Sequence, residues 1–333
     1  MTRVFRAAPR EIVQGVAVAV AFIFPGQGSQ AVGMGKALAE ASGAARAVFA
    51  EIDEALSQDL SKLMWEGPED ELALTENAQP ALMTVSLAVI RALESDYGIV
   101  VANIAKYVAG HSLGEYSALA AAGTFSLADT ARLLKVRGRA MQEATPVGTG
   151  AMAALLGLDY GDAVAVAAEA AQGEVCEAAN DNAPGQVVVS GHKGAVERAV
   201  EIAKRAGAKR AIPLSVSAPF HCALMKPAAG IMTGALRSTP MRPPSVPLVA
   251  NVTATPLTNP HDIRASLIDQ VTMTVRWRES MACMAADGVK LFCELGSGKV
   301  LTRLVKRSAP EAAGVAIGTA ADIDAALAQL RQS

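Results

Sequence analysis

Residues 106–122, KYVAGHSLGEYSALAAA, decide the fold. Residues 106–109 predict a short strand, and the alanine-rich run 115–122 predicts a helix, because alanine is the strongest helix former. Between them, at 110–114, lies a G-x-S-x-G run whose glycines relieve crowding at a strained turn. Such a turn lifts the serine hydroxyl above a sheet, beside helix N–H groups that can face negative charge on a carbonyl oxygen. Ser112 is therefore the candidate nucleophile.

A second buried strand is predicted near the start of the chain. Residues 18–24 (VAVAFIF) form an uninterrupted apolar run closed by Pro25 and Gly26, which is typical of a strand covered on both faces of a parallel sheet. Helices that should cover this sheet, and its later strands, follow along the chain. The helices are expected at about 31–41, 44–57, 79–96 and 127–143, and the strands at 246–252 and 290–296.

A different pattern occupies residues 148–215. The order of elements there is β-α-β-β-α-β, the ferredoxin-like arrangement, which can close a small core of its own. We therefore predict an α/β fold in which a hydrolase-like domain with a parallel central sheet is interrupted by a ferredoxin-like subdomain. The predicted boundaries are a leader at 1–20, a catalytic domain formed by 21–147 and 216–333, and an inserted subdomain at 148–215.

The composition excludes several classes of protein. Of 333 residues, 51% are hydrophobic and 19% charged, and the formal net charge is -2, which fits an ordinary globular protein and not one that coats nucleic acid. The four cysteines form no CxxC pair, so neither a metal site nor a disulfide framework is expected. Every apolar run falls short of the roughly 20 residues that span a membrane. We expect a cytoplasmic protein without membrane or nucleic-acid partners.

The first twenty residues superficially imitate a targeting segment. Arg3, Arg6 and Arg10 precede an apolar run, but that run continues into the strand at 18–24 without a small-residue cleavage site. Cleavage would remove part of a strand, so a loose leader or a misassigned start codon is the favoured interpretation.

A serine nucleophile needs a base, and the chain has four histidines. His111 is adjacent to Ser112, so its side chain should project elsewhere. His192 and His261 fall in a predicted turn and a predicted loop, which favours solvated surface positions. His221 follows the inserted subdomain and can return to the serine through the fold, although a histidine satisfied within the core remains the alternative.

Six motifs stand out along the chain. They are FIFPGQGSQ, GHSLGEYSALAAAG, VRGRAMQEA, NDNAPGQVVVSG, SAPFHCALM and LGSGKVLTRLVKR. In their order and spacing they resemble the malonyl-CoA:acyl carrier protein transacylase family. The resemblance covers about residues 20–310 and implies the same interrupted α/β fold.

The resemblance also implies roles for individual residues. Ser112 matches the nucleophile and His221 its general base. The backbone carbonyl of Gln270 matches the group that orients the histidine, which implies that the side chain at this position matters less than the chain path.

Two further parts of the site follow from the same resemblance. The N–H groups of Gln27 and Leu113 match the oxyanion hole, although a strand-ending turn would equally explain the GQG sequence around Gln27. Arg137 matches the residue that pairs with the free carboxylate of a malonyl group. Taken alone, an arginine on a helix with Arg132 and Arg139 more often belongs to a solvated face.

The implied reaction transfers a malonyl group from malonyl-CoA to an acyl carrier protein of fatty-acid or polyketide synthesis. It implies no metal and no other cofactor, and a monomer is expected. Two alternatives stay open at the level of sequence. A serine hydrolase of esterase type shares G-x-S-x-G but has no use for Arg137 and lacks an HGGG-type segment here. A non-catalytic relative that only binds carrier proteins would not need Ser112, His221 and Arg137 together.

Overall fold

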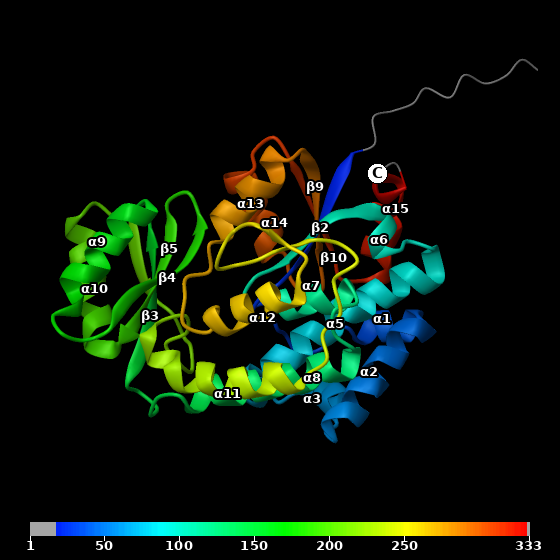
Figure 1. Cartoon of the computed structure of the whole chain (residues 1–333), viewed down its shortest axis with the longest axis horizontal. Coiled ribbons are helices and arrows are strands. Elements are labelled where there is room, and N and C mark those ends of the chain that lie inside the picture. The colour runs from blue at the N-terminus through cyan, green and yellow to red at the C-terminus, as the bar shows by residue number, and fades with distance from the viewer. Residues whose placement is uncertain (1–17, 332–333) are drawn as a thin grey trace, which may run out of the picture.

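A six-stranded sheet lies at the centre of the molecule (Figure 1), in a computed structural model that describes residues 18–331. The strand order is β10-β9-β1-β2-β7-β8, and every neighbouring pair is parallel except β7 and β8. The strands are β1 (Ala19–Phe24), β2 (Ala105–Gly110), β7 (Leu248–Val249), β8 (Pro256–Leu257), β9 (Val289–Leu295) and β10 (Ala313–Ile317).

Both faces of this sheet are covered by helices. Along β1, Phe22 and Phe24 belong to one large hydrophobic cluster, and Ala21 and Ile23 belong to another on the opposite face, because successive side chains of a strand alternate. The larger cluster includes α1 (Lys36–Ala41), α2 (Gly43–Leu56), α3 (Leu60–Glu66), α5 (Thr75–Tyr97), α7 (Gly114–Ala121), α8 (Leu127–Glu143), α11 (Lys226–Ser238), α12 (Pro260–Asp269) and α15 (Ala320–Leu330). The smaller includes α13 (Trp277–Ala286) and α14 (Val300–Ser308). The short helices α4 (Glu69–Ala73), α6 (Val101–Ile104) and η1 (Ala223–Met225) complete the connections.

A second, antiparallel sheet forms a separate unit at one end of the molecule, on the left in Figure 1. Its strand order is β4-β5-β3-β6, and its two helices pack on it around a hydrophobic cluster of their own. The elements follow the chain as β3 (Gly150–Leu156), α9 (Tyr160–Ala171), β4 (Cys176–Ala183), β5 (Gln186–His192), α10 (Lys193–Arg205) and β6 (Arg210–Pro213). This is the βαββαβ order of a ferredoxin-like unit, so the predicted fold class is confirmed.

Some predicted elements have different bounds in the structure. The helix expected at 31–41 begins only at Lys36, because residues 32–35 form a turn. The strand expected at 246–252 is reduced to Leu248–Val249, because the chain turns at 251–253. This early turn places Asn251 at the carboxyl end of β7.

The predicted leader spans residues 1–20, and residues 1–17 lie outside the described residues. Ala19 and Val20, at the end of the predicted leader, belong to β1. Among the helices within residues 18–331, none has both the length and the apolar character needed to cross a membrane.

Candidate active site

Ser112 lies at a tight turn between β2 and α7. Its φ is 54°, in the left-handed region that side chains other than glycine rarely occupy. A Cβ on Gly110 would lie 1.9 Å from the carbonyl carbon of Gly114, and a Cβ on Gly114 would lie 2.3 Å from the carbonyl oxygen of Phe24. At both positions another stretch of backbone occupies the space that a Cβ would need. Only glycine therefore fits at Gly110 and Gly114, on either side of the serine.

The imidazole of His221 lies beside the serine hydroxyl. The distance from Ser112 Oγ to His221 Nε2 is 2.8 Å, and the distance from His221 Nδ1 to the carbonyl oxygen of Gln270 is also 2.8 Å. Because a carbonyl oxygen only accepts, Nδ1 carries the proton and Nε2 presents a lone pair to the hydroxyl. Burial, followed by the positive charge of Arg137, lowers the pKa of His221 to about 3, so the ring is neutral near pH 7.

Arg137 faces the same hydroxyl from α8. Its Nη2 donates to Ser112 Oγ at 3.1 Å and to Gln270 Oε1 at 2.8 Å, and its Nη1 donates to Gln79 Oε1 at 2.9 Å. Only 1% of Arg137 is exposed, and its guanidinium lies over the ring of Tyr116. The solvated-face alternative is therefore wrong for this residue.

These groups line a cleft of about 410 Å³ between the two sheet units. The large domain contributes Gln27, Ser112, Leu113, Arg137 and His221, and the smaller unit contributes side chains from all three of its longer strands. The latter include Met152, Asn180, Asn182, Gln186 and Val188. All the site residues expected from the sequence lie at this cleft or, in the case of Gln270, directly beneath it.

Comparison with known proteins shows the family to which the chain is related. Residues 21–328 match the acyl transferase domain family. Malonyl CoA-acyl carrier protein transacylase of Escherichia coli strain K12 is 48% identical over 287 residues, which cover 86% of this chain and 92% of the relative. That of Bacillus subtilis strain 168 is 46% identical, with 94% and 98% covered. The chain belongs to the malonyl CoA-acyl carrier protein transacylase family. The resemblance inferred from the six motifs is thus confirmed.

Solved structures extend the match to the whole fold of this acyl transferase. The acyl-carrier-protein-S-malonyltransferase from Bartonella henselae superposes with a TM-score of 0.92 at 55% identity, covering 94% of this chain and 99% of the other. A malonyl-transacylase solved in complex with a type II PKS acyl-carrier protein gives a TM-score of 0.90 at 42% identity, with 93% and 99% covered.

Beneath the cleft of the acyl transferase lies a buried polar network that the sequence analysis missed. Asn251 Oδ1 accepts from the Ser112 N–H at 2.8 Å, and Asn251 Nδ2 donates to the Gly110 carbonyl at 2.7 Å. Glu115 Oε2 accepts from the Asn251 N–H at 2.9 Å and from Gln270 Nε2 at 3.0 Å. The side chain of Gln270 therefore belongs to this network, in addition to its backbone carbonyl, beside which the resemblance implied that the side chain matters less.

Two signals in the sequence could have pointed to these residues. Glu115 is a lone charge at the start of an alanine-rich run, and Asn251 directly follows the apolar run VPLVA. Polar residues just beyond the carboxyl ends of parallel strands often belong to sites, because those ends meet at one edge of the sheet.

The other histidines are separate from the serine hydroxyl. His111 is half-buried, and its Nε2 lies 2.8 Å from Asn182 Oδ1. His192 is half-buried, and its Nδ1 accepts from the Val175 N–H, so the expected solvated position is wrong for it. His261 is exposed, as predicted, but it lies in the first turn of α12 and not in a loop.

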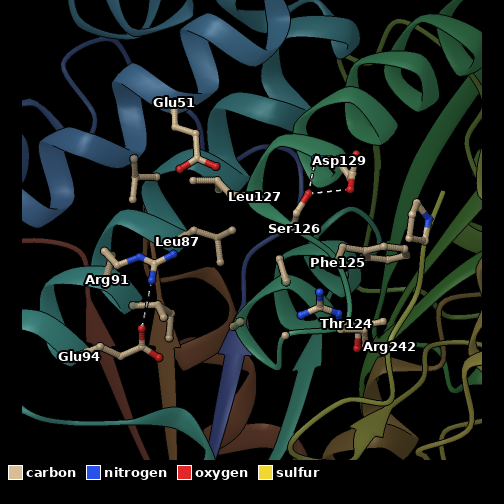
Figure 2. Close-up of a pocket in the computed structure, with 16 residues that line it drawn as sticks. Glu51, Leu87, Arg91, Glu94, Thr124, Phe125, Ser126, Leu127, Asp129 and Arg242 are labelled. Atoms are coloured by element: carbon tan, nitrogen blue, oxygen red, sulfur yellow. Dashed lines mark hydrogen bonds and ion pairs between the residues drawn. The ribbon is translucent and has the colours of Figure 1, made fainter.

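A larger cavity, of about 620 Å³, lies elsewhere between α2, α5 and the start of α8 (Figure 2). Its charged side chains largely meet partners around the cavity: Arg91 lies 3.8 Å from Glu94, and Ser126 Oγ donates to Asp129 at 2.7 Å. Among the described residues, the lining includes no histidine or cysteine. This cavity therefore offers no nucleophile and base pair comparable to Ser112 and His221.

Proposed function

We propose that this protein transfers a malonyl group from malonyl-CoA to the phosphopantetheine thiol of an acyl carrier protein, through an ester on Ser112. One observation carries the proposal. A hydroxyl at a strained turn lies 2.8 Å from a neutral imidazole nitrogen and 3.1 Å from a buried guanidinium. Nucleophile, base and carboxylate receptor thus converge on one cleft.

In the first half-reaction, His221 Nε2 takes the hydroxyl proton while Ser112 Oγ attacks the thioester carbonyl. The negative charge on the carbonyl oxygen is stabilised by the N–H groups of Gln27 and Leu113, and removal of one such donor typically costs ~3 kcal/mol. The intermediate then expels the thiolate of coenzyme A, which takes the proton from His221. A malonyl ester remains on Ser112.

The second half-reaction runs the same steps in reverse. The carrier-protein thiol gives its proton to His221 and attacks the ester carbonyl, and Ser112 Oγ recovers the proton as it leaves. Because the first product departs before the second substrate reacts, the kinetics are ping-pong. No electrons are gained or lost overall, so the chemistry needs no redox cofactor, and His221 and the two N–H groups supply proton transfer and charge stabilisation without a metal.

Arg137 selects the acyl group. A guanidinium offers parallel donors to a carboxylate, and each charge-assisted bond contributes about 1.5–3 kcal/mol. An acetyl group lacks the carboxylate and would leave this buried cation without a charged partner. The acyl carrier protein as partner is supported by the relatives' names and by the neighbour solved in complex with such a protein. We further propose action as a monomer in the cytoplasm.

Incubation with radiolabelled malonyl-CoA tests the proposal. Label should accumulate on Ser112 and pass to an added carrier protein, and Ser112→Ala should abolish it. Arg137→Ala should lose malonyl transfer but retain acetyl transfer. Arg139→Ala, whose side chain is 59% exposed on the same helix, is the matched control and should behave as the wild type.

Two results would contradict the proposal. Rapid loss of label to water, without transfer to the carrier protein, indicates a hydrolase. Absence of label on the folded wild-type protein indicates a module that only binds carrier proteins.

A further inference from the structure

The side chain of Gln270 connects three parts of the site. Its Nε2 donates to the Ser112 carbonyl at 3.0 Å and to Glu115 Oε2 at 3.0 Å, and its Oε1 accepts from Arg137 Nη2 at 2.8 Å. The residue has no exposed surface. A side chain that merely filled space beneath the histidine would not need to satisfy so many polar groups at once.

The surroundings fix which way the Gln270 amide points. The Ser112 carbonyl only accepts, and the Glu115 carboxylate, when ionised, only accepts, so the NH₂ group must face them. The amide oxygen is thereby left facing Arg137. A flipped amide would set its oxygen against two acceptors and its NH₂ group against a guanidinium that only donates.

Arg137 has no direct carboxylate partner, since none of the ion pairs found within residues 18–331 includes it. Glu115 is connected to it through the Gln270 amide. Burial lowers the pKa of Arg137, whereas the charge of Glu115 raises it. Burial also raises the pKa of Glu115 to about 7, against the opposing effects of the hydrogen bonds from Asn251 and Gln270 and of the charge of Arg137. The amide therefore separates the cation from a carboxylate that, in direct contact, would compete with an acyl carboxylate.

The hydrogen-bond count of the guanidinium shows what this arrangement leaves available. Each terminal nitrogen carries two hydrogens. Gln79 Oε1 accepts one from Nη1 and Gln270 Oε1 accepts one from Nη2. One hydrogen remains on each terminal nitrogen, and the remaining one on Nη2 points at Ser112 Oγ, where the acyl group is to be attached. Arg137 thus keeps N–H donors that are not used by Gln79 or Gln270, beside the place where the acyl group is attached, and these can bind its carboxylate.

We propose that the side chain of Gln270 is a positioning residue that aims the Arg137 guanidinium and so sets the preference for a carboxylated over a neutral acyl group. This role rests on the proposed function and adds a second group to its selectivity. It is separate from the backbone carbonyl of the same residue, which orients His221. The amide acts on the carboxylate end of the acyl group through Arg137.

Gln270→Met tests the role, because methionine has nearly the same length and keeps the backbone carbonyl. We expect kcat/KM for malonyl transfer to fall about 10- to 100-fold, mainly through KM, which corresponds to the loss of one charge-assisted bond. Acetyl transfer should fall much less, so the malonyl-to-acetyl ratio of kcat/KM should drop at least tenfold. The ratio is the decisive quantity, since the lost bond to the Ser112 carbonyl affects both acyl groups alike.

Gln79→Met provides an independent test, because Gln79 holds Nη1 of the same guanidinium and has no hydrogen bond to Ser112 or His221. It should lower the same ratio even if Gln270→Met proves unstable. Gln58→Met is the matched control. Gln58 bonds to Lys135 and Asn77 away from the cleft, and its replacement should leave the ratio unchanged.

An equal fall for both acyl groups in both test variants would show that Gln270 only supports the turn, and would overturn the proposal. An unchanged ratio at normal rates would overturn it too. Failure of the wild-type protein to accept malonyl-CoA is a different result, visible before any variant is made, and it refutes the proposed function itself.

Discussion

Asn251→Ala should remove the side chain that supports the turn carrying Ser112. The Asn251 amide bonds to the Ser112 N–H on one side and to the Gly110 carbonyl on the other. It thus holds both ends of a turn in which Ser112 adopts a φ of 54°. The side chain is fully buried, so water cannot readily replace it in the folded protein.

The expected magnitude follows from the two groups left without partners. Each unsatisfied buried donor or acceptor costs about 1–3 kcal/mol, so the free energy of unfolding should fall by about 2–6 kcal/mol. Left-handed backbone at a residue other than glycine stores about 1–3 kcal/mol, and without the amide the turn can relax. Because a displacement of ~1 Å can cost ~100-fold in rate, Ser112 acylation should slow by about that factor.

Two assays measure these effects on the same samples. Urea denaturation gives the free energy of unfolding, and rapid-quench labelling with malonyl-CoA gives the acylation rate. Asn259→Ala is the control. Asn259 caps α12 through a hydrogen bond to the His261 N–H, so its loss should cost ~1 kcal/mol without slowing acylation.

The reasoning is refuted if Asn251→Ala unfolds at the urea concentration of the wild type and is acylated at the wild-type rate. A lower free energy of unfolding with an acylation rate equal to that of the wild type would refute only the predicted slowing of acylation. It would show that the turn keeps its geometry without the Asn251 amide.

Three further predictions concern protonation, packing and a helix cap. Burial and the charge of Arg137 hold the pKa of His221 at about 3, so the ring stays neutral as the pH falls through 6.5. Protonation of His221 should therefore not reduce kcat/KM for acylation even at ~pH 5. A pH profile of kcat/KM with a half-maximal value near pH 6.5 would contradict this. Gly114→Ala places a Cβ 2.3 Å from the Phe24 carbonyl oxygen and should lower the free energy of unfolding by ~3 kcal/mol, measured by urea denaturation. Thr319→Ala removes the capping box of α15, remote from the cleft, and should lower the thermal midpoint through a loss of ~1 kcal/mol while acyl transfer stays normal.

The main elements of the fold could be predicted because their signals are local. The uninterrupted apolar run at 18–24 indicated a strand buried on both faces, and β1 contributes to hydrophobic clusters on either side. The order of strands and helices at 148–215 likewise predicted a ferredoxin-like unit. Bounds were less predictable: β7 is two residues long because the chain turns at Asn251, which the apolar run VPLVANV did not indicate.

The site was partly predictable for the same reason. Ser112 is marked by glycines that its turn requires, and motif resemblance pointed to His221, Arg137, Gln27, Leu113 and the Gln270 carbonyl. The buried state of Arg137 was not predictable, because its helix neighbours Arg132 and Arg139 are exposed and the three look alike in sequence.

By itself, the sequence determined the alternation of buried strands and amphipathic helices and the glycine-flanked serine, since each depends on residues a few positions apart. Tertiary structure alone decided that Glu115, Asn251 and the Gln270 amide meet beneath the cleft, and that Gln79 bonds to Arg137 in its lining. These residues come from four separate segments, and a polar side chain carries no local mark that distinguishes burial from solvent exposure. Their hydrogen bonds arise only when the strands align, because the free energy of a buried polar group depends on partners that distant parts of the chain supply.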